Sequence, residues 1–299
     1  MPVSAVDLLA LGAAACWALT SVLSAPQARH LGSFAFTRWR MLLVLLMLWP
    51  VVLFMGRWHS LTWPALGVLA VSGLVGIFVG DTALFAAMNR LGPRRTGVLF
   101  ATHALFSAVL GYAVLGERMG VQAMLGGLLV VGGVMTAIFL GRHKDESHDW
   151  EADRGHWAWG VALGLLAALC QALGSLIAKP VMAAGVDPVA ATAVRVSATC
   201  VAQFVLLWSG ARVARAHQPA TAYHLARAGL SGFIGMGVGM SLILLALQHG
   251  DVGMVGVLSS VSPVLVLPLL WWYLGRAPAR GAWLGALLTV LGTVLVLLR

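Results

Sequence analysis

The chain has 299 residues, of which 60% are hydrophobic and only 10% are charged, and its mean hydropathy is +0.92. Soluble domains carry roughly a quarter charged residues, so this composition excludes an ordinary soluble protein and predicts a membrane protein. The net charge of +9 does not indicate nucleic-acid binding, because the basic residues are spread over the connections between apolar stretches.

Ten apolar stretches follow one another along the chain, and each approaches the roughly 20 residues that a helix needs to cross a bilayer. Their apolar runs are continuous rather than alternating, which predicts helices and not the strands of a barrel. The first stretch lacks a basic segment before it and is too long for a signal-peptide core, so we expect it to be retained. The stretches are residues 3–25, 34–55, 63–88, 96–115, 121–140, 157–178, 189–209, 228–247, 252–274 and 281–298.

The predicted fold class is therefore an all-α membrane protein with ten transmembrane helices. The largest polar segment separates the first five stretches from the last five. We expect a first five-helix repeat at residues 1–140, a polar linker at 141–156 and a second five-helix repeat at 157–299.

The two halves share a glycine pattern that recurs without a gap 159 positions later. Because five crossings is an odd number, the second half would enter the membrane upside down, related to the first by a pseudo-two-fold axis in the membrane plane. Inverted repeats of this kind are typical of transporters that work by alternating access. Gly73, Gly76, Gly80, Gly116, Gly126 and Gly133 recur as Gly232, Gly235, Gly239, Gly275, Gly285 and Gly292.

Several short motifs follow one another in a particular order along the apolar stretches. Trp17 lies in the first stretch, Arg38 and Arg195 lie early in the second and seventh, and Gly116-Glu117-Arg118 closes the fourth. With its ten-helix plan, the chain resembles the drug/metabolite transporter superfamily in its EamA-type branch. The resemblance implies a multi-pass transporter of the bacterial inner membrane, monomeric or homodimeric, that exports a small molecule.

The chain departs from the family pattern in two places. Gly275-Arg276 stands where the first half has Gly116-Glu117, and Ala104 stands where the second half has Pro263. The family usually carries a proline in both halves. Whether the fourth helix breaks near Ala104 is therefore open.

Two arginines are the first candidate substrate-binding residues. Arg195 lies about six residues inside its stretch, or about 9 Å, which is deep for snorkelling, so we expect it to face a cavity. Arg38 is shallower, and contact with lipid headgroups explains it nearly as well. We expect Arg38, rather than Arg40, to be the counterpart of Arg195. Two such arginines favour a substrate with an anionic group such as a carboxylate.

Asp81 is an acid well inside a helix, and its counterpart in the second half is Met240. An unpaired carboxylate there would stay protonated, so two interpretations are open. Asp81 pairs with a basic group such as Arg38, or it binds a proton or a substrate amine during transport. His103 lies near the middle of its stretch, and this depth favours a place at a cavity.

Trp17, Tyr112, Gln171 and Lys179 complete the candidate substrate-binding set, although Lys179 lies near a helix end and can simply reach the headgroups. We expect a secondary active transporter of a small polar metabolite, such as an amino acid or organic anion, with protons or a counter-substrate as coupling partner. Asp81 with Trp17 and Tyr112 also suits an alternative, the proton-coupled export of cationic or amphipathic drugs. An enzyme is not expected, because no nucleophile, base or metal constellation is visible. No cofactor is expected either, since the chain lacks a phosphate-binding glycine loop.

The basic residues also bear on orientation. The positive-inside rule places the side with more lysine and arginine in the cytoplasm, which predicts that both termini lie outside. The resemblance implies the reverse, with both termini inside, and the two expectations stand side by side. Connections after odd-numbered stretches carry Arg29, Arg90, Arg94, Arg95, Arg142, Lys144, Arg154, Arg212, Arg215, Arg227, Arg276 and Arg280, and the opposite side carries Arg57, Arg118, Lys179 and Arg299.

Overall fold

The computed structural model describes residues 4–139, 157–274 and 280–298, and within these ranges every regular element is a helix. Seven helical stretches are long and apolar enough to cross a membrane. Three shorter apolar helices join them, at Val121–Thr136, Val252–Val266 and Gly281–Leu297. The prediction of a helical membrane protein is confirmed. The linker expected at 141–156 and the Gly275-Arg276 pair lie outside the described residues.

The first half contains α1 (Ala5–Leu31), α2 (Ser33–Phe54), the 3₁₀ turn η1 (Arg57–Ser60), α3 (Trp63–Gly73), the π-helical η2 (Leu74–Val79), α4 (Gly80–Ala101), α5 (His103–Leu115) and α6 (Val121–Phe139). The second half contains α7 (Trp157–Ala183), α8 (Pro188–Trp208), the 3₁₀ turn η3 (Arg212–Ala214), α9 (Ala222–Gly232), the π-helical η4 (Phe233–Gly239), α10 (Met240–His249), α11 (Val252–Ser259), α12 (Ser262–Leu274) and α13 (Arg280–Leu297).

Side-chain caps explain where several helices begin. Ser4 and Asp7 exchange hydrogen bonds in a capping box at the start of α1. The hydroxyl of Thr62 accepts a bond at the start of α3, and the carboxylate of Asp187 does the same for α8. These caps matter in a bilayer, where an unsatisfied backbone group costs several kcal/mol.

A one-residue turn at Thr102 interrupts the fourth apolar stretch, although this stretch lacks the proline of its counterpart and otherwise runs as one helical span from Arg95 to Leu115. α4 ends at Ala101 and α5 begins at His103, and the hydroxyl of Thr102 donates to the carbonyl of Leu99 at 2.6 Å. In the second half α11 ends at Ser259 and α12 begins at Ser262, just before Pro263. The sequence left open whether the fourth helix is interrupted near Ala104. The structure shows a turn at Thr102, where a threonine hydroxyl bonds to the backbone in place of the effect of a proline.

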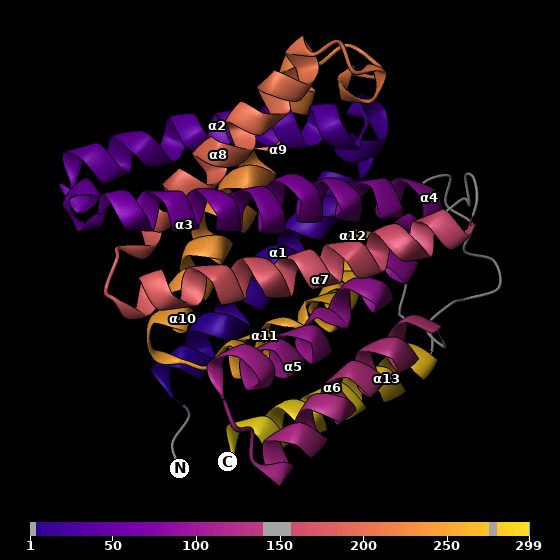
Figure 1. Ribbon diagram of the computed structural model, residues 1–299. Helices are drawn as coiled ribbons and strands as arrows, with labels where there is room; N and C mark the ends of the chain where they lie inside the picture. The colour runs from indigo at the N-terminus through magenta and orange to yellow at the C-terminus, as the bar shows by residue number, and fades with distance from the viewer. Residues whose placement is uncertain (1–3, 140–156, 275–279, 299) are drawn as a thin grey trace.

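α6 and α13 lie together at one edge of the molecule (Figure 1) and approach each other through glycines. A methyl group on Gly126 would lie 2.8 Å from the carbonyl oxygen of Gly292, and one on Gly133 would lie 2.7 Å from that of Gly285. Small residues let helix backbones come this close in lipid. The contact is reciprocal, since Gly285 and Gly292 are the counterparts of Gly126 and Gly133.

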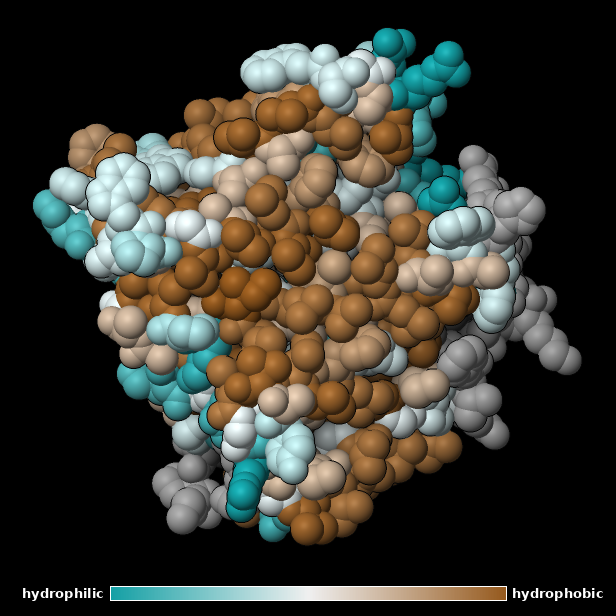
Figure 2. Space-filling view, in the orientation of Figure 1, coloured by the Kyte–Doolittle hydropathy of each residue, from teal (hydrophilic) through white to brown (hydrophobic). Residues whose placement is uncertain are grey.

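The outer surface suits a bilayer. Apolar side chains cover most of the face in Figure 2, and polar ones gather toward its edges. Large tryptophans are exposed near helix ends, as is typical of the membrane–water interface. They are Trp58, Trp63, Trp157, Trp159, Trp208 and Trp283.

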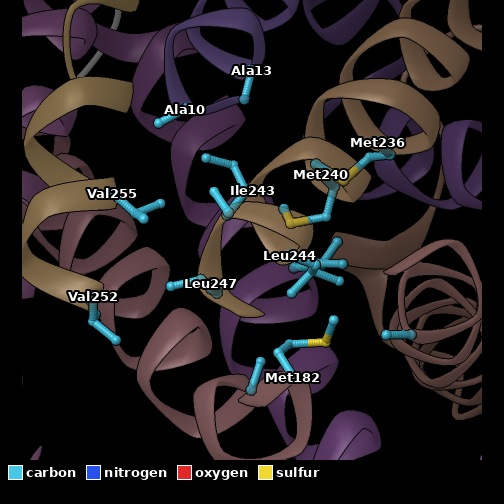
Figure 3. Packing of buried hydrophobic residues seen from close by; sticks show 14 of the residues in the cluster. Ala10, Ala13, Met182, Met236, Met240, Ile243, Leu244, Leu247, Val252 and Val255 are labelled. Carbon is cyan, nitrogen blue, oxygen red and sulfur yellow. The ribbon is translucent and has the colours of Figure 1, made fainter. Parts of the chain in front are cut away.

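The main core surrounds η4 and α10. Met236, Met240, Ile243, Leu244 and Leu247 project from this segment among side chains of α1, α7 and α11 (Figure 3). Met240 is 1% exposed and opens α10. This core brings a methionine from the second half close to the buried polar groups described next.

Candidate functional site

Two arginines lie wholly inside the molecule, each against a π-helical segment of the other half. Arg40 of α2 is 3% exposed and Arg195 of α8 is 1% exposed. A methyl group on Gly235 of η4 would lie 2.8 Å from Nη2 of Arg40, and one on Gly76 of η2 would lie 2.9 Å from Nη2 of Arg195. Glycine therefore makes room for each guanidinium, in π-helical turns of a kind often found at functional sites.

One turn earlier in the same helices, another pair of equivalent glycines contacts the same two arginines. Gly73 packs on the backbone of Arg195, and Gly232 packs 3.3 Å from the carbonyl oxygen of Arg40, measured from an added methyl group. Glycines 159 positions apart thus meet arginines 155 positions apart. The motif Thr37-x-x-Arg40 also recurs 155 positions later, as Thr192-x-x-Arg195.

The expectation that Arg38 is the counterpart of Arg195 is therefore wrong, and Arg40 takes that place. Nη1 of Arg38 donates instead to the carbonyl of Ala214, at 2.7 Å, so Arg38 binds η3. The error has a simple origin. The spacing of 159 begins at Gly73, whereas α2 and α8 are related by a different spacing.

Asp81 has a basic partner, but that partner is Arg40 and not Arg38. Oδ2 of Asp81 accepts a hydrogen bond from Nη1 of Arg40 at 2.9 Å, with both residues buried. The guanidinium also lies over the ring of Phe85, 5.5 Å from its centroid. A second, more exposed ion pair joins Arg57 and Asp187.

Arg195 has a different partner, the thioether of Met240. Its Nη1 lies 3.1 Å from Sδ of Met240, and its Nε has no hydrogen-bond partner. Met240 stands 159 positions after Asp81. The second half therefore repeats the arrangement of the first, with a weakly accepting sulfur where the first half has a carboxylate.

Trp17 and Gln171 occupy matching places in α1 and α7. The indole of Trp17 donates to the carbonyl of Gly235 at 3.2 Å, next to Arg40. The preceding residues match as well, because Cys16 meets Gly239 and Cys170 meets Gly80. Gln171 is 7% exposed. Both side chains thus lie in the helices that cross the π-helical segments.

The remaining candidates lie elsewhere. His103 is buried beside Phe100, with ring centroids 5.1 Å apart. Tyr112 is 67% exposed on α5, and the structure does not bring it to the arginines. The ammonium of Lys179 donates to the carbonyls of Leu247 and Gly250, each at 2.9 Å, so it caps the end of α10.

Glu117 of the Gly116-Glu117-Arg118 motif also has a place. Its carboxylate accepts hydrogen bonds from the backbone N–H groups of Val252 and Gly253, at 2.8 and 3.1 Å. A carboxylate at a helix N-terminus is stabilising, and here it caps α11. In the described ranges no cluster of His, Cys, Asp and Glu could hold a metal ion.

Three comparisons with known proteins bear on these features. The EamA-like transporter family matches residues 4–139 and again residues 158–298, so that each half is matched separately. Among curated proteins, none matches the chain. A protein of known crystal structure is similar with a TM-score of 0.76, over 98% of this chain and 96% of that chain. Its sequence identity is 18%, so this likeness concerns the fold alone.

Proposed function

Since the chain belongs to the EamA-like transporter family, part of the drug/metabolite transporter superfamily, and is thus a membrane transporter, we propose that it exports a small polar metabolite by secondary active transport. An amino acid or an organic anion is the substrate class that Arg195 favours, because its buried guanidinium has a thioether and not a carboxylate at Nη1. Transport proceeds by alternating access, coupled to protons or to a counter-substrate, in the bacterial inner membrane.

The proposed architecture is ten spans in two inverted repeats, residues 1–140 and 157–299. Three observations support it. The family matches each half separately. The glycines of α6 and α13 contact each other reciprocally, as self-complementary surfaces related by a two-fold axis do. Each π-helical segment receives an arginine from the opposite half.

The last of these observations carries the mechanism. Arg40 reaches across to Gly235 and Arg195 reaches across to Gly76, so both guanidinium groups lie where the halves meet. If the halves rock about the membrane midplane, these are the contacts that change first. A charged group at such a contact can bind the substrate in one arrangement and release it in the other.

The rival function, export of cationic or amphipathic drugs, needs a free carboxylate. Asp81 is the carboxylate at this depth, and Arg40 already neutralises it at 2.9 Å. This pair weighs against a cation site. Transport of organic cations that is lost in Asp81→Asn would favour the rival function, whereas transport that survives in this variant would count against it.

The experiment is uptake into proteoliposomes without ATP. Amino acids, organic anions and amines are offered under a proton gradient or against an internal counter-substrate. We expect saturable uptake of one anionic or zwitterionic class, loss of uptake in Arg195→Ala, and uptake in the control variant Arg57→Gln, whose ion pair lies near the surface. Absence of uptake for every compound under every gradient would contradict the proposal.

A further inference from the structure

We infer that Arg195 binds one carboxylate group of the substrate, and that the thioether of Met240 holds the place of this carboxylate when no substrate is bound. The inference rests on the transport function proposed above and names the chemical group that its central site takes. It comes from one difference between the two halves.

In the first half a buried arginine meets a buried carboxylate. Nη1 of Arg40 lies 2.9 Å from Oδ2 of Asp81, directly after the glycine-lined η2. In the second half the equivalent atom, Nη1 of Arg195, lies 3.1 Å from Sδ of Met240, directly after η4. Both halves therefore place a group beside Nη1 of the buried arginine, but this group is a carboxylate in the first half and a thioether in the second.

Arg195 therefore has no carboxylate that hydrogen-bonds to it. Asp81 attracts its charge through space but is bonded to Arg40. Arg195 is 1% exposed, and although the Nε atoms of both arginines lack a hydrogen-bond partner, only Arg40 has a carboxylate at Nη1. Burying a guanidinium is costly unless it is paired and hydrogen-bonded. The charges of Arg40, Asp81 and Arg195 sum to one positive charge, which a single monoanion would neutralise.

A carboxylate fits this site better than a larger anion. Aspartate supplies the equivalent group in the first half, so the space beside the guanidinium suits a carboxylate of the same size. Guanidinium and carboxylate also match as a planar, doubly hydrogen-bonded pair. A phosphate group carries about 1.5 to 2 negative charges at neutral pH and would exceed the single positive charge.

Met240 can give way to such a group. Methionine is unbranched and flexible, and its sulfur is a weak acceptor that a carboxylate readily replaces. Its side chain lies among Met236, Ile243 and Leu244 in the core around α10 (Figure 3). On the other side of the guanidinium stand Gly76 and Gly174, whose added methyl groups would lie 2.9 and 3.2 Å from Nη2. These two glycines pack against the guanidinium and against each other, so a carboxylate reaches Arg195 only where the side chain of Met240 moves aside.

The test is thermal unfolding of the full-length protein in detergent, at constant ionic strength. The probes are acetate and lactate, each compared with its uncharged amide, L-alanine, compared with L-alaninamide, which keeps the ammonium group but lacks the carboxylate, and inorganic phosphate. The variants are Met240→Asp, which restores the missing carboxylate, Met240→Asn, which has the same size without the charge, and Arg195→Gln.

We expect at least one carboxylate to raise the unfolding temperature of the unaltered protein more than its amide does, since a ligand that binds the folded state stabilises it. Met240→Asn gives a smaller carboxylate-specific shift than the unaltered protein, because its amide oxygen also accepts from Arg195 but carries no negative charge. Met240→Asp and Arg195→Gln lose it, and Met240→Asp unfolds at a higher temperature than Met240→Asn without any ligand, because its carboxylate pairs with Arg195.

Three results would overturn the inference. The first is the absence of any carboxylate-specific shift, and the second is a carboxylate shift that persists in Met240→Asp. The third is a larger shift with phosphate than with every carboxylate. A further outcome separates this inference from the proposed function. If proteoliposomes take up amides or amines while no carboxylate raises the unfolding temperature, the anion site at Arg195 is rejected but the transport function is retained.

Discussion

Arg40 and Arg195 occupy equivalent places but differ in the group that faces their charge. Asp81 faces the first and Met240 faces the second. The Arg40–Asp81 pair neutralises its own charges, so we assign it a structural role. The Arg195–Met240 contact leaves the positive charge of Arg195 for an anionic ligand to neutralise.

We predict that Asp81→Asn destabilises the protein by about 3 kcal/mol, because it leaves the guanidinium of Arg40 buried without a counter-charge. Thermal unfolding in detergent measures this. The control Arg57→Gln breaks the more exposed pair with Asp187 and should cost less than about 1 kcal/mol. Equal losses in the two variants would contradict the structural role of the Arg40–Asp81 pair.

Gly76 gives a second prediction at this scale. An alanine there would place its methyl group 2.9 Å from Nη2 of Arg195, so we expect Gly76→Ala to lower stability by ~1–3 kcal/mol and to impair uptake. Gly67 in the neighbouring α3 has no atom within 4 Å of such a methyl group, so Gly67→Ala serves as the control. Unchanged uptake by Gly76→Ala would remove this contact from the mechanism.

The sequence predicted that Arg195 faces a cavity, and it left two interpretations open for Asp81: pairing with a basic group such as Arg38, or binding of a proton or a substrate amine. The pattern of glycines could not reveal Arg40, because its spacing of 159 does not extend back into α2. The Thr37-x-x-Arg40 motif carried the missing signal, in register with Thr192-x-x-Arg195. In the sequence, Met240 is recognisable only as the residue that stands where the first half has Asp81. Its contact with Arg195 joins two different helices, so the sequence pattern does not reveal it.

At the scale of helices, glycine spacing decides which surfaces touch. Gly132 and Gly133 are neighbours on α6, yet only Gly133 faces α13. We predict that Gly133→Ala destabilises the protein by ~1–3 kcal/mol, because its methyl group would lie 2.7 Å from the carbonyl oxygen of Gly285. Thermal unfolding of Gly133→Ala and Gly132→Ala compares the two faces.

Gly132 has no atom within 4 Å of an added methyl group, so Gly132→Ala should be neutral or slightly stabilising, since alanine favours a helix. If both variants unfolded at the same temperature, close packing of α6 on α13 would not be what holds this helix pair together.

Helices were the most predictable elements, because long apolar runs leave few alternatives in a bilayer. Their ends were less predictable. α1 and α7 continue past residues 25 and 178, through Pro26 and Pro180, as far as Leu31 and Ala183. The one-residue turn at Thr102 escaped a search for proline, since the carbonyl of Leu99 there accepts from both the backbone N–H and the hydroxyl of Thr102.

For the whole molecule, the proposed inverted repeats predict a topology. With five crossings in each half, both termini lie on one side of the membrane and the connection between the halves lies on the other. Single cysteines in place of Pro2, His148 and Leu298, in a variant without Cys16, Cys170 and Cys200, test this with an impermeant maleimide in intact cells. We expect the two terminal positions to react alike and the central one to react oppositely.

The charge count further predicts that the terminal positions are the ones labelled from outside. Labelling of the central position alone would support the orientation that the family resemblance implies, and would leave ten spans intact. Different reactivity of the two terminal positions would contradict an even number of crossings.

In the proposed cycle the two halves carry a small anion across the membrane by opening Arg195 to one side and then to the other. Counterflow tests this: proteoliposomes loaded with an unlabelled monocarboxylate are diluted into a trace of the labelled compound, without ATP or an ion gradient. We expect transient, saturable accumulation of label by the unaltered protein and by Arg57→Gln, and none by Arg195→Gln or Met240→Asp. Accumulation in Arg195→Gln equal to that of the unaltered protein would contradict it.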